Sequence, residues 1–167
     1  MKSLKAKAGL KIFGLFAPEA LAYELDRDPV REPSLAEMTA KAIEVLSIDR
    51  DGFSLMVEGS KIDWAAHAND PVGLVGDILA FDDAVKISLD FARRNGDTVV
   101  IAASDHGNSG ISMGDRSTTS GYDTLPLSAF VDPLRKARRT GEGLESLLAP
   151  DRSNTKEILV FSRRPVC

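Results

Sequence analysis

Two short apolar runs in this chain are each followed within a few residues by charged side chains. Residues 53–57 lead directly into Glu58, and residues 98–102 lead into the adjacent pair Asp105 and His106. Runs of this length that are rich in β-branched and aromatic residues are typical of strands, and the second one suits a strand covered on both faces. The two runs therefore predict neighbouring strands whose ends carry polar side chains.

Helical patterns lie beside these runs. Ser34 is followed three residues later by Glu37, a capping-box pattern ahead of an apolar stripe, so we expect a helix to begin there. Residues 71–95 carry apolar side chains at helical spacing, and Gly96 is a typical residue after a helix end. Further short strands are expected at residues 9–16 and 157–161. Alternating strands and helices predict an α/β fold with a mostly parallel central sheet.

The bulk composition narrows the function classes. With 167 residues, 43% of them hydrophobic, the chain is long enough for one domain with a sizeable core. Its net charge of −4 offers no basic surface for nucleic acid, and no window is apolar enough to span a membrane. The single cysteine, Cys167, excludes an internal disulfide and a cysteine-based zinc site. We find no signal peptide at the N-terminus.

The polar residues after the strands suggest a metal site. Ligands of open α/β sheets gather beyond the carboxyl ends of the strands. On a helical turn, Asp63 and His67 would share one face and could bind one zinc ion, and Asp105 with His106 offers the same donor types to a second. Glu58, which offers only oxygen, better suits magnesium.

Each of these residues also has an ordinary structural interpretation. Asp63 and His67 could form a surface pair on a helix, and an adjacent Asp-His pair is common by chance. Glu58 could cap the following helix. Spacing alone places a metal site only slightly ahead of these interpretations.

The sequence around these residues resembles the alkaline phosphatase family. Residues 57–70, VEGSKIDWAAHAND, resemble the metal-binding segment of that family, and residues 104–107, SDHG, resemble its second-zinc segment. The likeness is clearest over residues 13–114. The Glu-Gly ahead of the aspartate is more particular to alkaline phosphatases than to the wider superfamily of phosphodiesterases, sulfatases and phosphomutases.

The resemblance implies a three-layer sandwich around a mostly parallel sheet, incomplete in this chain, which would form a single partial domain over residues 1–167. It also implies two Zn²⁺ ions and one Mg²⁺ ion. Asp63 and His67 would bind one zinc, Asp105 and His106 the other, and Glu58 the magnesium. No segment matches the family's serine nucleophile, so no catalytic residue is identified. No histidine follows His106 to act as the family's third ligand of one zinc.

The expected function is hydrolysis of small phosphomonoesters by an alkaline-phosphatase-type enzyme whose nucleophile-bearing half lies outside this sequence. Two alternatives stay open: a sister activity of the superfamily, or a non-catalytic remnant that binds metal. The resemblance further implies a periplasmic or extracellular location and allows a homodimer. We expect no nucleic-acid partner and no membrane span.

Overall fold

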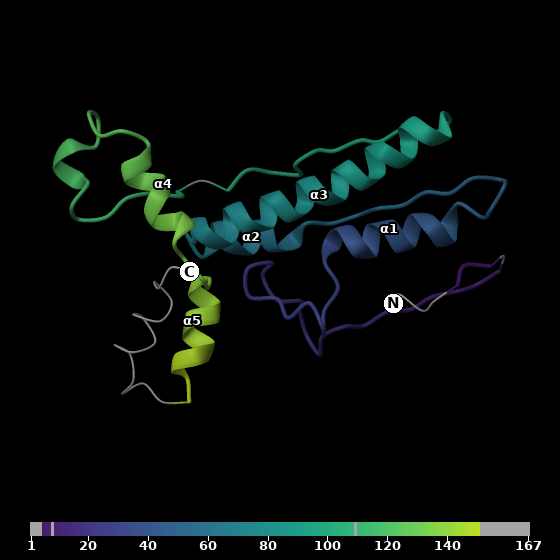
Figure 1. Ribbon diagram of the computed structural model, residues 1–167, viewed down its shortest axis with the longest axis horizontal. Helices are drawn as coiled ribbons and strands as arrows, with labels where there is room; N and C mark the ends of the chain where they lie inside the picture. Colours follow the sequence, from purple (N-terminus) through teal and green to yellow (C-terminus); the bar gives the residue numbers. More distant parts are fainter. Residues whose placement is uncertain (1–4, 8, 109, 151–167) are drawn as a thin grey trace.

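A computed structural model describes residues 5–7, 9–108 and 110–150, and this part of the chain is helical (Figure 1). The helices are α1 (Leu35–Leu46), α2 (Ser60–His67), α3 (Pro71–Asn95), the 3₁₀ turn η1 (Thr119–Gly121), α4 (Ser128–Arg135) and α5 (Gly141–Leu148). Both α1 and α2 pack against the long helix α3. The segment that bears η1 and α4 lies beyond one end of α3 (Figure 1).

The predicted start of the first helix and the predicted end of the second are confirmed. Ser34 is the N-cap of α1, its hydroxyl accepts a hydrogen bond from the Glu37 amide, and the Glu37 carboxylate accepts one in return from the Ser34 amide. Such a reciprocal pair satisfies amide donors that have no partner within the helix. Helix α3 ends at Gly96 in the left-handed conformation, with φ +84°, which glycine adopts without steric cost.

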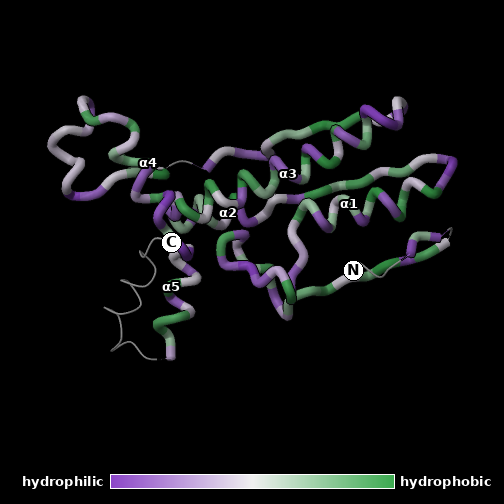
Figure 2. Tube along the Cα trace, in the orientation of Figure 1, coloured by the Kyte–Doolittle hydropathy of each residue, from purple (hydrophilic) through white to green (hydrophobic). Residues whose placement is uncertain are grey.

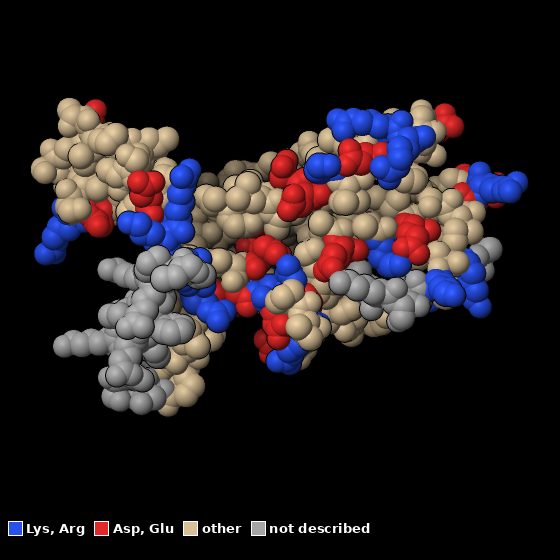
Figure 3. All heavy atoms as spheres, viewed as in Figure 1, with Lys and Arg blue, Asp and Glu red and all other residues tan. Residues whose placement is uncertain are grey.

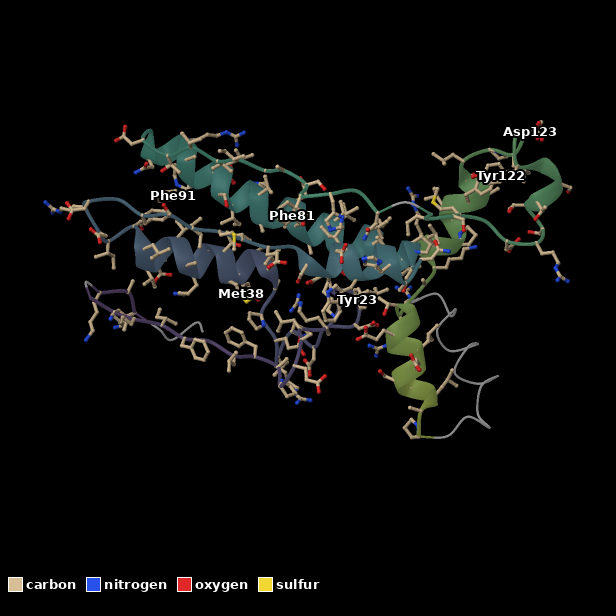
Figure 4. The ribbon with its side chains drawn as sticks, turned by 180° about the vertical axis from the view of Figure 1, so that it is seen from behind. Tyr23, Met38, Phe81, Phe91, Tyr122 and Asp123 are labelled. Carbon is tan, nitrogen blue, oxygen red and sulfur yellow. The ribbon has the colours of Figure 1, made fainter. Side chains whose placement is uncertain are left out.

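Aromatic residues of α3 hold the segment that precedes α2. The Phe91 ring lies 6.0 Å from the Phe53 ring, centroid to centroid. Phe81, also on α3, packs so closely on Gly59 that a Cβ atom added there would lie 2.9 Å from its ring (Figure 4). The glycine after Glu58 is therefore required for the close approach of α2 to α3.

The prediction of an α/β fold, a three-layer sandwich around a mostly parallel central sheet, is wrong. Among the described residues no strand forms, and residues 9–16, 53–57 and 98–102 run as extended or irregular chain without strand pairing. The last two segments are apolar stretches in Figure 2, and Val99 and Ile101 are 84% and 85% exposed. They line a groove of about 820 Å³ rather than pairing with each other. A strand needs a neighbour to satisfy its backbone groups, and neither segment has one here. The predicted strand at residues 157–161 lies outside the described residues.

One carboxylate joins the start of α3 to the start of α5. Asp70 Oδ1 accepts hydrogen bonds from the amides of Val72 (2.9 Å) and Gly73 (3.1 Å), which caps α3. Its Oδ2 accepts a third from the Gly141 amide, at 2.6 Å, on the first residue of α5. A negative charge at two helix N-termini is favourable for both helix dipoles.

A second aspartate completes the attachment of α5. Thr140, the N-cap of α5, is fully buried, and its hydroxyl donates a hydrogen bond to the carboxylate of Asp26. Asp26 also accepts from the Thr140 amide, at 3.3 Å. The segment around residue 26 and α5 are therefore held together by polar contacts across more than a hundred residues of sequence. None of the helices within the described ranges is long and apolar enough to cross a membrane.

We expect Asp70→Ala to destabilise the protein more than Ser34→Ala does. The Ser34 variant loses one cap, which typically costs about 1 kcal/mol of unfolding free energy. The Asp70 variant leaves three amides without their acceptor and should cost about 2–3 kcal/mol. Urea denaturation of both variants measures the difference. Equal losses would show that the contact between Asp70 and α5 contributes nothing.

Asp77 on α3 should make stability depend on pH. Burial raises the pKa of its carboxyl from 3.8 to about 6, although its hydrogen bond from the Glu24 amide acts in the opposite direction. Because the folded-state pKa exceeds the unfolded value, this group's stabilising contribution is full below about pH 4 and is lost as the pH rises through 6. After discounting for solvent screening, the loss should be about 1–2 kcal/mol.

The variant Asp77→Asn, which stays neutral, should lack this loss. Urea denaturation between pH 4 and pH 8 measures the parent and the variant side by side. The same pH dependence in both proteins would exclude Asp77 as its source.

Candidate metal site

Helix α2 presents two of the sequence-predicted ligands on one face. Asp63 lies in its first turn, where a carboxylate is favourable for the helix dipole, and His67 lies in its last turn. The turn after α2 contains Asn69, whose φ of +50° is a left-handed conformation that asparagine tolerates. The helical turn that would place Asp63 and His67 on one face is thus present, as part of α2.

The Asp63 carboxylate lies close to both histidines of the chain. Its Oδ1 atom lies 3.5 Å from His67 Nε2 and 3.7 Å from His106 Nε2. Asp105 Oδ2 lies 3.7 Å from the same nitrogen of His106. The side chains of Asp63 and Asp105 are 40% and 90% exposed, so the cluster is open to solvent. Four of the five predicted ligands therefore lie together, although the outermost two, Asp63 and His106, are 43 residues apart in sequence.

Glu58, the fifth predicted ligand, is not joined to this cluster by a hydrogen bond or an ion pair within the described ranges. Its side chain is exposed. It precedes Gly59, the N-cap residue of α2, and no side-chain hydrogen bond caps the start of this helix. Glu58 therefore lies just before the start of α2. Its role as a magnesium ligand stays a prediction.

Two asparagines hold the His106 loop against α2. The sequence analysis did not predict them. Asn108 Nδ2 donates a hydrogen bond to Asp63 Oδ1 at 2.6 Å and approaches the Asp63 carbonyl oxygen at 3.4 Å. Asn69 Oδ1 accepts a hydrogen bond from the Ser112 amide at 3.1 Å. Only the position of Asn108, two residues after His106, could have drawn attention to it. These contacts bring two distant segments to one carboxylate.

The donors suit zinc in pairs but do not form a complete site. Ligand atoms around a tetrahedral zinc at about 2.0–2.1 Å are separated by roughly 3.4 Å, close to the two distances from Asp63 Oδ1. Nevertheless, the described residues contain no group of three or more histidine, cysteine or acidic side chains arranged to hold a metal ion. Catalytic zinc sites normally have three protein ligands, so this chain offers the right chemistry with too few converging donors.

Charges of both signs surround these elements. On the face in Figure 3, acidic and basic side chains are interspersed, and basic residues do not form a continuous surface there.

Comparison with known proteins places the chain in a family. The family model for alkaline phosphatase matches residues 1–140. The chain is 41% identical over 142 residues to alkaline phosphatase 4 of Bacillus subtilis, and 40% identical over 139 residues to alkaline phosphatase 3 of the same organism. It is 40% identical over 155 residues to the repressible alkaline phosphatase of Saccharomyces cerevisiae.

The matches cover most of this chain but a minor part of each relative. They include 85%, 83% and 89% of the chain, and 31%, 28% and 27% of the respective relatives. The chain thus spans less than a third of the length of these relatives. Because the family model covers well over half of the chain, the resemblance seen in the sequence is confirmed. The chain belongs to the alkaline phosphatase family.

Proposed function

We propose that this chain carries the metal-ligand segment of an alkaline-phosphatase-type phosphomonoester hydrolase. In this proposal the serine nucleophile comes from sequence outside residues 1–167. The observation that supports it most directly is the Asp63 carboxylate, which lies within 4 Å of both histidines of a chain from this family. The substrates would be small phosphomonoesters.

The residues divide into two zinc pairs and one magnesium ligand. Asp63 and His67 would hold one zinc, Asp105 and His106 the second, and Glu58 the magnesium. Bound zinc supplies Lewis-acid stabilisation of the charge that develops on phosphoryl oxygens. The chain itself orients the donors: Asn108 fixes one oxygen of the Asp63 carboxylate, and α2 sets the spacing between Asp63 and His67. Such outer contacts fix the direction in which a ligand points.

A non-catalytic, metal-binding role is the second candidate for this chain by itself. It is favoured by the donor set, because the described residues contain no group of three or more side chains that could hold a metal ion. A location outside the cytoplasm and a homodimeric assembly are also part of the proposal. They rest on family membership, and protein localisation and light scattering would test them.

Calorimetric titration of the purified chain with zinc tests the ligand assignment. We expect the parent to bind zinc and His106→Ala to bind fewer ions, because one pair loses its nitrogen donor. Asp97→Asn, which removes an exposed carboxylate beyond the C-terminal end of α3, should bind as the parent does. Asn108→Ala should retain the number of sites and lower the affinity by about 10-fold. Identical binding by the parent and His106→Ala would contradict the assignment.

Catalytic participation requires a longer protein. In Bacillus subtilis alkaline phosphatase 4 with its matching segment replaced by residues 1–140 of this chain, we expect hydrolysis of an aryl phosphomonoester. Asp105→Asn should lower kcat/KM of this protein by at least about 100-fold, because charge stabilisation by a zinc is weakened.

Asp97→Asn serves again as the control. A near-parental rate for Asp105→Asn would contradict the catalytic proposal. Faster hydrolysis of a phosphodiester or a sulfate ester would favour a sister activity of the superfamily.

A further inference from the structure

Lys61, two residues before Asp63 on α2, lies between two aromatic rings. Its Nζ atom is 4.5 Å from the centroid of the Tyr23 ring and 4.0 Å from the centroid of the Trp64 ring. A cation within about 6 Å of an aromatic face is attracted by the ring's electrons, more strongly when water is excluded. The Lys61 side chain is only 11% exposed, so water is largely excluded.

The two rings belong to different parts of the fold. Trp64 is one helical turn from Lys61 on α2, whereas Tyr23 lies in the segment that precedes α1 and is 4% exposed. Figure 4 shows Tyr23 beside the described helices rather than at the periphery. A third contact comes from α5, where the Glu142 carboxylate lies 4.0 Å from Lys61 Nζ. One ammonium group thus contacts three separate segments.

Four carboxylates surround Tyr23, and the positive charge of Lys61 partly balances them. Burial raises the pKa of the Tyr23 hydroxyl, and four carboxylates raise it further: Glu142, Asp70, Asp77 and Asp26. The positive charge of Lys61 in turn acts to lower the pKa of Asp77. Lys61 therefore offsets like-charge repulsion where the segment before α1, α3 and α5 meet.

We propose that Lys61 is a positioning residue for the metal site. Its stack on Tyr23 and Trp64, with Glu142, fixes α2 against the segment before α1 and against α5, and so holds Asp63 within reach of His106. The functional meaning of that position rests on the proposed function. The stack itself and its effect on the histidines do not, because both can be measured without metal.

Three lysine variants of the full, metal-free chain separate the effects. Lys61→Met keeps the length of the side chain and removes the charge, whereas Lys61→Arg keeps a cation that can stack on rings. Lys86→Met is the matched control, since Lys86 is a 69% exposed lysine on α3 that pairs with Asp90 at 2.7 Å. Circular dichroism confirms that each variant folds.

Tryptophan fluorescence reads the stack directly, because Trp64 is the only tryptophan of the chain. We expect Lys61→Met to shift its emission to longer wavelength and to increase quenching by acrylamide. Lys61→Arg and Lys86→Met should resemble the parent. An unchanged emission in Lys61→Met would overturn the stack.

Imidazole NMR signals read the position of the site, because the chain has only two histidines. In Lys61→Met the signals of His67 and His106 should move toward those of the unfolded chain, and Lys61→Arg should restore them. A changed tryptophan emission with unchanged imidazole signals would overturn the positioning role. If Lys61→Met does not fold, Lys61→Arg decides: parental signals support the proposal and displaced signals overturn it. A parent that binds no zinc contradicts only the proposed function.

Discussion

The carboxylate of Asp70 connects the helices that the remaining structure depends on. It caps α3 through two amides and accepts a hydrogen bond from the first residue of α5. Exposed amides at a helix start must find acceptors, and here one side chain serves two helices. The next residue of α5, Glu142, lies 4.0 Å from Lys61 Nζ on α2.

The Asp63 and Asp105 side chains are open to solvent, as are the apolar segments that lead to the site. Segments 53–57 and 98–102 lead toward Glu58 and toward the Asp105 loop, yet in this chain they line a groove instead of forming a sheet. Apolar side chains such as Ile101 stay in contact with solvent as a result. The same lack of covering structure leaves Asp105 exposed. Within the described ranges, neither a sheet nor a group of three or more potential metal ligands is present.

Local sequence signals predicted the helices well and the strands poorly. The Ser34 capping box, the apolar stripe of residues 71–95 and the terminal Gly96 each act within a few residues, and each is present in the structure. The strand predictions required backbone partners that no local pattern can supply. Similarly, the spacing of Asp63 and His67 predicted their contact, because helix geometry fixes it. Asn108 was missed because its hydrogen bond to Asp63 crosses 45 residues.

The sequence by itself determined the family, the donor types and the helical register that pairs Asp63 with His67. These depend on residue identity and on interactions over one or two turns of a helix. Only the tertiary structure decided that His106 meets the same carboxylate and that Lys61 lies between two aromatic rings. Each of these contacts joins segments whose separation is set by the packing of whole helices, and packing depends on the complete set of surfaces that are present.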